Sequence, residues 1–132
     1  MNADQRRFDK LSYEILAAAF EVSNTLGAGF LERVYERALV KELSARGLRV
    51  TQQAPFTITY KGESVGDYLA DLLVEDLILV EIKCSDHFAP EHLAQCINYL
   101  RASNLTLCLL LNFQKPKVEC KRVVNRYLAE SA

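Results

Sequence analysis

The stretch LILVEIKCSD, residues 77–86, constrains the fold more than any other part of the sequence. Side chains alternate along a strand, so its leucines occupy one face while Ile78, Val80 and Ile82 occupy the other. Apolar residues on both faces are typical of a central strand that is covered on both sides. The run LTLCLLLNF, residues 105–113, is equally uniform and predicts a second central strand.

Three helices are predicted around these strands. Apolar residues recur at helical spacing over residues 7–26, and LERVYERALVKELSARG, residues 31–47, is rich in strong helix formers and ends at Gly47. A third helix covers APEHLAQCINYLRAS, residues 89–103, with Pro90 in its first turn.

The segments between the second and third helices predict a meander of strands. LRVTQQ, FTITYKGE and VGDYLADLLVED, which lie within residues 48–76, are rich in β-branched and aromatic residues and form two or three strands. LILVEIKC adds another, and residues 105–113 return after a helical crossover, which makes a strand parallel to a neighbour. The predicted class is therefore α/β or α+β, with helices on a mixed sheet and a basic tail at the end.

Composition narrows the classes of protein that remain. A chain of 132 residues that is 50% hydrophobic fits one domain over residues 1–132. The polar start MNADQRRFDK is unlike a signal peptide, and no apolar run reaches the ~20 residues that span a bilayer, so we expect a cytoplasmic protein. We interpret the four cysteines as reduced thiols because they are twelve residues apart and lack metal-binding spacing: Cys84, Cys96, Cys108 and Cys120.

The charge distribution limits where nucleic acid could bind. The net charge of −1 gives no general attraction for nucleic acid, so such binding must be local. The segment KPKVECKRVVNRYL is the one basic concentration and is either a phosphate contact or simply a solvated face. Its basic residues are Lys115, Lys117, Lys121, Arg122 and Arg126.

Charged residues interrupt the first central strand at its end. Glu81 and Lys83 lie on one face, and the preceding strand carries Asp71 in an otherwise apolar setting. If the intervening turn places Val74 opposite Ile78, Asp71 lies opposite Glu81, whereas a two-residue turn would separate the carboxylates.

Two acids and one lysine at buried strand ends have two interpretations. One is an ion pair that serves only the fold, although two acids and one base leave the site net negative. The other is a divalent-cation site, because Mg²⁺ and Mn²⁺ prefer oxygen ligands and retain waters, one of which can become a nucleophile.

Two helices contribute further candidates. At ~100° per residue, Glu32 and Glu36 project into the arc that contains the apolar residues of the second helix. On the third helix, Gln95 and Tyr99 stand four residues apart on one side.

These motifs together resemble a known superfamily. Asp71, then Glu81-Ile82-Lys83 on the next strand, then Gln95-x-x-x-Tyr99 on the following helix is similar to the PD-(D/E)XK nucleases, with Ala70 in place of the proline. The stretch GFLERVY, followed by YLADLLVED, LVEIK, AQCINYL and LLLNF, resembles more closely the small bacterial GxxExxY proteins. The resemblance implies a restriction-endonuclease-like α-β-β-β-α-β core.

The resemblance also implies roles for individual residues. Asp71, Glu81 and the carbonyl of Ile82 would bind Mg²⁺ or Mn²⁺, and Lys83 would orient the attacking water or stabilise charge on the phosphate. A glutamate from the second helix would add a ligand: Glu32 occupies the GxxExxY motif, but likeness to the corresponding helix of archaeal Holliday junction resolvases favours Glu36. Gln95 and Tyr99 would position DNA or the metal site.

Three functional hypotheses follow. The first is a metal-dependent nuclease that cuts phosphodiester bonds, with DNA as the expected partner and a homodimer as an assembly common among such enzymes. The second is a module that binds nucleic acid or protein on the same fold without cleaving. The third is a plain α/β domain whose charges form a structural network.

Overall fold

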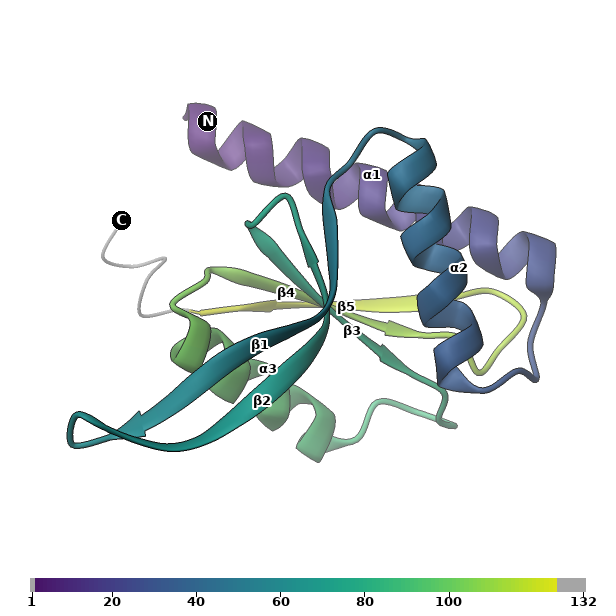
Figure 1. The fold of residues 1–132 in the computed structure, drawn as a ribbon. Coiled ribbons are helices and arrows are strands. Elements are labelled where there is room, and N and C mark those ends of the chain that lie inside the picture. Colours follow the sequence, from purple (N-terminus) through teal and green to yellow (C-terminus); the bar gives the residue numbers. More distant parts are fainter. Residues whose placement is uncertain (1, 126–132) are drawn as a thin grey trace.

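The computed structural model describes residues 2–125 of the chain (Figure 1). Asn2 caps the first helix by accepting a 2.7 Å hydrogen bond from the N–H of Gln5, which explains why this helix starts earlier than the periodicity predicted. Gly47, with φ of 84°, follows the end of the second helix as expected. The elements are α1 (Ala3–Leu26), α2 (Glu32–Ala45), β1 (Val50–Tyr60), β2 (Glu63–Val74), β3 (Ile78–Lys83), α3 (Pro90–Ser103), β4 (Leu107–Asn112) and β5 (Glu119–Val124).

The strands form one mixed sheet with the order β1-β2-β3-β4-β5. All neighbours are antiparallel except β3 and β4, which are parallel and joined by α3. The predicted crossover is therefore confirmed, and the fold is an α+β restriction-endonuclease-like core, with α1 and β5 added at its ends.

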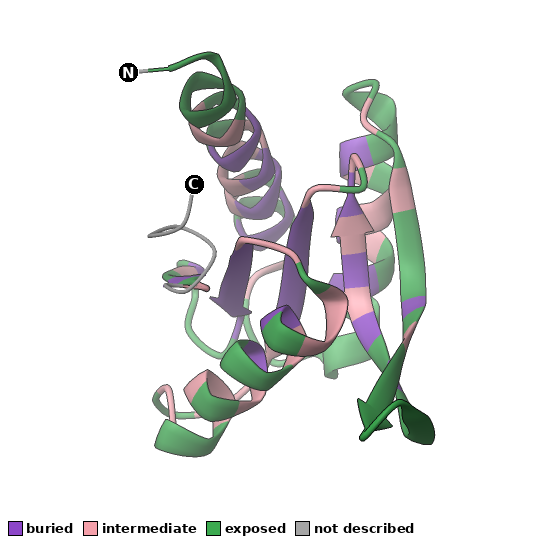
Figure 2. Cartoon of the chain, turned by 90° about the vertical axis from the view of Figure 1, so that its left-hand side faces the viewer, coloured by how far each residue is buried: buried purple, intermediate pink, exposed green. Residues whose placement is uncertain are grey.

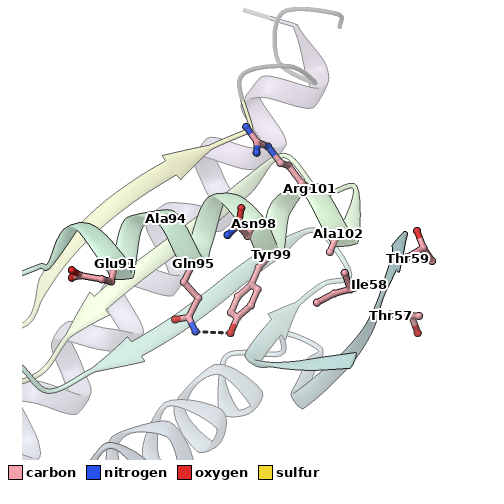
Figure 3. Close-up of a pocket in the computed structure, with 10 residues that line it drawn as sticks. All are labelled: Thr57, Ile58, Thr59, Glu91, Ala94, Gln95, Asn98, Tyr99, Arg101 and Ala102. Atoms are coloured by element: carbon pink, nitrogen blue, oxygen red, sulfur yellow. Dashed lines mark hydrogen bonds between the residues drawn. The ribbon is translucent and has the colours of Figure 1, made fainter. Parts of the chain in front are cut away.

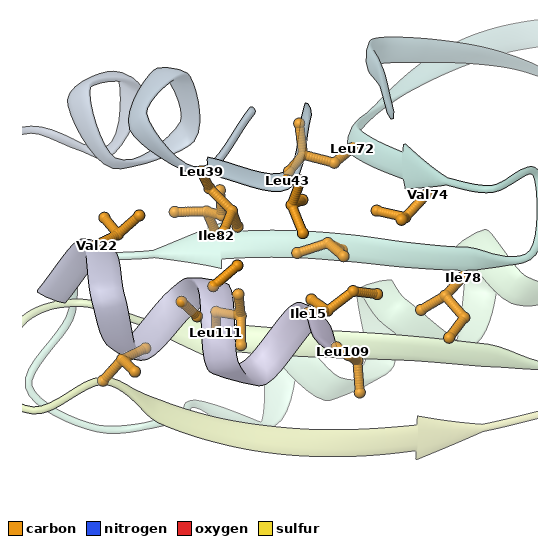
Figure 4. Packing of buried hydrophobic residues seen from close by; sticks show 14 of the residues in the cluster. Ile15, Val22, Leu39, Leu43, Leu72, Val74, Ile78, Ile82, Leu109 and Leu111 are labelled. Atoms are coloured by element: carbon orange, nitrogen blue, oxygen red, sulfur yellow. The ribbon is translucent and has the colours of Figure 1, made fainter. Parts of the chain in front are cut away.

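The helices cover both faces of the sheet. α1 and α2 lie on one face and α3 lies on the other (Figure 1), and the central strands between them are buried (Figure 2). On the first face, Ile15 and Val22 of α1 and Leu39 of α2 pack against apolar side chains of β2, β3 and β4 (Figure 4). The predicted two-sided burial of LILVEIK and LTLCLLLNF is confirmed, because β3 and β4 are buried along nearly their whole length.

Two predictions about strands need correction or refinement. Residues 48–76 hold two strands, β1 and β2, within the predicted two or three. β1 runs through Pro55 because an edge strand tolerates a missing N–H. The basic tail contains a strand, β5, which pairs with β4 along its length. Its charged residues hid the strand because β5 is an edge strand with mostly exposed side chains.

The described residues add two observations on class. No helix within residues 2–125 has the length and apolarity needed to cross a membrane. All four cysteines are free thiols, as predicted.

Candidate active site at the fork between β2 and β3

The sheet divides where the predicted acidic residues lie. Pairing between β2 and β3 stops at Leu72 and Val80, whereas β1 stays paired with β2 and β3 with β4 beyond that point. Val74 lies opposite Ile78, so the register on which the prediction depended is confirmed. The next residues beyond the last pair are Asp71 and Glu81, which therefore lie at the vertex of a fork.

Side chains replace the backbone ladder at this vertex. The N–H of Asp71 donates a 2.7 Å hydrogen bond to Oε2 of Glu81, and the N–H of Ile82 donates a 2.8 Å bond to Oδ2 of Asp71. The carboxylate of Glu81 therefore binds the backbone of Asp71, and the carboxylate of Asp71 binds the backbone of the residue after Glu81. The fork is held open without leaving these two N–H groups unsatisfied.

The two carboxyl groups are in an environment that disfavours their charged forms. Glu81 is 4% exposed, and burial followed by the negative charge of Asp71 raises its pKa to about 8. Burial also raises the pKa of Asp71; the bond from Ile82 opposes this shift and the charge of Glu36 adds to it. A cation bound at the fork would therefore offset the repulsion between these carboxyl groups.

Glu36 of α2 reaches the same fork. It is 8% exposed, and its Oε2 accepts a 2.6 Å hydrogen bond from Nε2 of Gln52. Nε2 of Gln53 lies 3.1 Å from both carboxylate oxygens of Glu36 and 3.4 Å from Oδ1 of Asp71. Sequence reasoning missed both glutamines, because nothing in the local pattern distinguishes them from other polar residues of an edge strand.

Glu32 has a different position from Glu36. It is exposed, and its Oε1 accepts a 3.3 Å hydrogen bond from the N–H of Cys84, just after the end of β3. Four residues later on the same helix, Glu36 approaches Asp71 through Gln53. The structure therefore brings Glu36 to the fork and Glu32 to the end of the strand.

The tyrosine of the GxxExxY motif, Tyr35, holds the loop before α2 in place. The hydroxyl of Tyr35 donates a 2.6 Å bond to the carbonyl of Gly27 and accepts a 3.3 Å bond from the N–H of Phe30. The ring of Tyr35 stacks on Phe113 at 4.7 Å. The motif thus fixes the loop between α1 and α2 against the carboxyl ends of β3 and β4.

Lys83 is connected to α3. Its Nζ donates a 3.3 Å hydrogen bond to Oε1 of Gln95, whose Nε2 donates a 2.6 Å bond to the hydroxyl of Tyr99. The ring of Tyr99 stacks on Tyr68 of β2 at 3.8 Å, and Tyr68 donates a bond to the Tyr99 carbonyl. The predicted Gln-x-x-x-Tyr pair therefore orients the lysine that follows the fork.

A groove of about 760 Å³ opens beside this pair, between β1 and α3 (Figure 3). Ile58 points across it toward Ala102, while Gln95 and Tyr99 lie together on the side of α3 that leads to the fork. Glu91 and Arg101 give the lining one charge of each sign. The groove therefore has no excess charge, and more of its exposed surface is apolar than polar although several lining side chains are polar.

The basic residues of the predicted phosphate contact are spread over β5 and the loop before it. Lys115 and Lys117 lie in the loop that follows β4, at the same end of the sheet as Lys83. Arg122 is turned toward α1, where it contacts Asp9 at 3.4 Å and Ser12 at 3.3 Å, and Lys121 is exposed on β5. Arg126 lies outside the described residues.

The donor set at the fork suits a hard divalent cation. Within residues 2–125, no three acidic, histidine or cysteine side chains are already grouped as a metal site. Asp71 and Glu81 nevertheless supply two crowded carboxylates, and Mg²⁺ is commonly bound by one or two carboxylates together with waters and substrate phosphates. The residues at the fork therefore fit such an ion by their chemistry.

The chain was compared with known families and structures. A family model described as the PD-(D/E)XK nuclease superfamily matches residues 9–123. No curated protein matches the sequence significantly.

Solved structures resemble this chain to different degrees. The crystal structure of SSO0001 has a TM-score of 0.55 and 17% identity over 75% of this chain, which spans 55% of the length of that protein. An alkaline exonuclease from Laribacter hongkongensis, LHK-Exo, has a TM-score of 0.47 and 18% identity over 85% of this chain and 79% of its own. The LHK-Exo complex with dAMP has a TM-score of 0.49 and 16% identity over 90% of this chain and 86% of its own. These likenesses concern the fold alone.

Proposed function

The chain belongs to the PD-(D/E)XK nuclease superfamily, and from this premise we propose that it is a divalent-metal-dependent nuclease that hydrolyses phosphodiester bonds of DNA. The observation that supports this most directly is the reciprocal pair of hydrogen bonds that joins Asp71 and Glu81 at the fork. Lys83, which follows on the same strand, completes the acid–acid–lysine set. The GxxExxY motif further supports a place among the small GxxExxY proteins.

Asp71 and Glu81 would bind Mg²⁺ or Mn²⁺, with the carbonyl of Ile82 and the carboxylate of Glu36 as further ligands. Burial and mutual repulsion hold the pKa of Glu81 at about 8, so the fork has more to gain from a cation than an exposed pair of acids would have. A bound divalent ion would supply an activated water and neutralise charge on the phosphate. Glu32 would act at a distance, by holding the backbone after β3.

Lys83 would stabilise the charge that develops on the phosphate oxygens. Its ammonium group is oriented by Gln95, and Gln95 is in turn held by Tyr99. A donor that is already oriented needs little reorganisation when the transition state forms. Such groups therefore contribute strongly to the rate of reaction. Gln95 and Tyr99 are therefore positioning residues in this proposal.

The substrate strand would lie along the groove between β1 and α3. The groove leads from Gln95 and Tyr99 outward, and its exposed surface, which is more apolar than polar, fits the bases of nucleic acid better than the phosphates. On the other side of the fork, Lys115 and Lys117 would contact backbone phosphates, with Lys121 and Arg122 farther away along β5.

A cleavage assay with matched variants tests the proposal. The full chain should cut labelled single-stranded, duplex or branched DNA in Mn²⁺ and not in EDTA. Glu81→Ala and Lys83→Ala should remove this activity while circular dichroism shows that both proteins remain folded, and Lys41→Ala, on the exposed side of α2, should retain it. Undiminished cleavage by the first two variants would identify a contaminant and refute the assignment.

One observation favours a non-catalytic binding module as the second candidate. Within the described residues, the carboxylates of Glu36 and Glu81 accept hydrogen bonds from glutamine and backbone N–H groups, and no three potential ligands are grouped as a metal site. A binding module would retain affinity for DNA in EDTA, yield no products in Mn²⁺, and weaken as salt rises if lysines contact phosphates.

A further inference from the structure

Gln53 has a backbone conformation that its neighbours in β1 do not share. Its φ is 53°, in the left-handed region that a residue with a side chain rarely adopts. The residues on either side, Gln52 and Ala54, are paired with Leu72 and Ala70 of β2, but no such pair includes Gln53. A strained residue beside a functional site is a reason to ask what its side chain does there.

The side chain of Gln53 lies between two carboxylates of like charge. Its amide nitrogen is 3.1 Å from both oxygens of Glu36 and 3.4 Å from Oδ1 of Asp71. A primary amide nitrogen carries two hydrogens and no lone pair for acceptance, so it can serve both acids at once. Of these two acids, Gln52 donates a hydrogen bond only to Glu36, at 2.6 Å.

We propose that Gln53 is a placeholder for the divalent cation: its amide group holds Glu36 and Asp71 together in the metal-free protein and leaves when the ion binds. This inference rests on the proposed metal site. The partial positive charge of the two N–H groups offsets part of the repulsion between the two acids, whereas a cation would offset it fully. The amide and the ion therefore compete for the same oxygens.

The position of Gln53 allows it to leave. The residue is exposed on an edge strand, so its side chain can turn into water without opening a cavity in the core. The amide then exchanges its bonds to carboxylates for bonds to water. Gln52 donates to Glu36, but among the described residues only Gln53 donates to both acids, so Gln52 would compete for Glu36 alone.

The competition predicts effects of different size for two adjacent glutamines. Gln53→Met keeps the side-chain length and removes the donors, so it should bind Mn²⁺ about tenfold more tightly than the wild type, the gain expected when a competing bond to a charged group is removed. Gln52→Met, the matched comparison, removes a donor to Glu36 but none to Asp71, so it should tighten binding by less than Gln53→Met does. Affinities are measured by calorimetry on the full chain at pH 8, with no DNA present.

The stability of the metal-free protein provides a second readout. Gln53→Met should unfold at a lower temperature in EDTA than the wild type, and Mn²⁺ should raise its unfolding temperature by more. A residue that only supports the fold would lower stability without tightening the binding of Mn²⁺.

The outcomes separate this inference from the proposed function. A larger gain in Mn²⁺ affinity for Gln53→Met than for Gln52→Met supports the placeholder, and an equal gain in both overturns it. Wild-type binding of Mn²⁺ that is unchanged or weakened in Gln53→Met overturns the placeholder and leaves the metal site in place. Absence of Mn²⁺ binding in all three proteins refutes the metal site, and the placeholder with it.

Discussion

Replacing Glu81 by glutamine should stabilise the metal-free protein at alkaline pH. The carboxyl group is buried, and burial together with the charge of Asp71 raises its pKa from an ordinary 4.5 to about 8. Between pH 4.5 and about 8, the folded protein therefore retains a proton on Glu81 that the unfolded chain has lost. The contribution of Glu81 to stability is therefore greatest below pH 4.5 and falls as pH rises toward 8, because the folded state binds more protons than the unfolded state over this range.

The size of the effect follows from the shift in pKa. A rise from 4.5 to about 8 corresponds to ~5 kcal/mol at ~1.4 kcal/mol per pKa unit, and relaxation around the charged group leaves about 2–5 kcal/mol. Glutamine remains neutral at every pH and its carbonyl oxygen can still accept the bond from the N–H of Asp71. For a chain of this size we expect the unfolding temperature to rise by roughly 6 °C or more at pH 9.

Thermal unfolding in EDTA at pH 5, 7 and 9, followed by circular dichroism, measures this effect. The difference between Glu81→Gln and the wild type should be small at pH 5 and should grow with pH. Glu63→Gln, an exposed residue at the start of β2, is the matched control and should show no such growth. At pH 9, Mg²⁺ should stabilise the wild type and not Glu81→Gln.

One result at pH 9 would contradict the raised pKa of Glu81. If Glu81→Gln is no more stable than the wild type at pH 9, the carboxyl group carries no desolvation penalty and the fork is not a crowded acidic site. The raised pKa of Asp71 adds a pH dependence of the same sign. The desolvation of Asp71 is present in both proteins, so the difference between them reports Glu81 together with its repulsion of Asp71.

The other predictions concern Lys83, the motif tyrosine and the two helix glutamates. Lys83→Met should lower the rate of Mn²⁺-dependent cleavage by about 10²-fold or more while calorimetry shows little change in Mn²⁺ affinity, since the ammonium group acts on the phosphate. Tyr35→Phe loses two backbone hydrogen bonds and should lower the free energy of unfolding in urea by ~1–3 kcal/mol. Glu36→Gln should weaken Mn²⁺ binding and Glu32→Gln should not; the reverse result would mean that α2 presents the other glutamate to the ion.

Much of the fold was predictable because its signals are local. Uniform apolar runs identified β3 and β4. The sequence allowed two registers for the turn between β2 and β3, and the structure has the one that brings Asp71 next to Glu81. β5 was missed for the opposite reason. Its charged residues are typical of a solvated tail, and only pairing with β4, a contact with a distant segment, makes it a strand.

The candidate site divides in the same way. Asp71, Glu81 and Lys83 stood out because charged residues interrupt strands that are otherwise apolar. Gln52 and Gln53 did not stand out, since their significance comes from Glu36, which lies 16 and 17 residues away on another element. The left-handed backbone of Gln53 likewise has no signal in its residue type.

The choice between Glu32 and Glu36 shows what the sequence determined and what the tertiary structure decided. The sequence by itself placed both glutamates on the inward arc of α2, because residues four apart are only ~40° apart around a helix. They differ by ~6 Å along the helix axis, and the angle at which α2 crosses the sheet converts that offset into different neighbours. Glu36 meets the fork and Glu32 meets Cys84 beyond it. Periodicity fixes the direction of a side chain from its own helix, whereas its partner depends on how that helix packs.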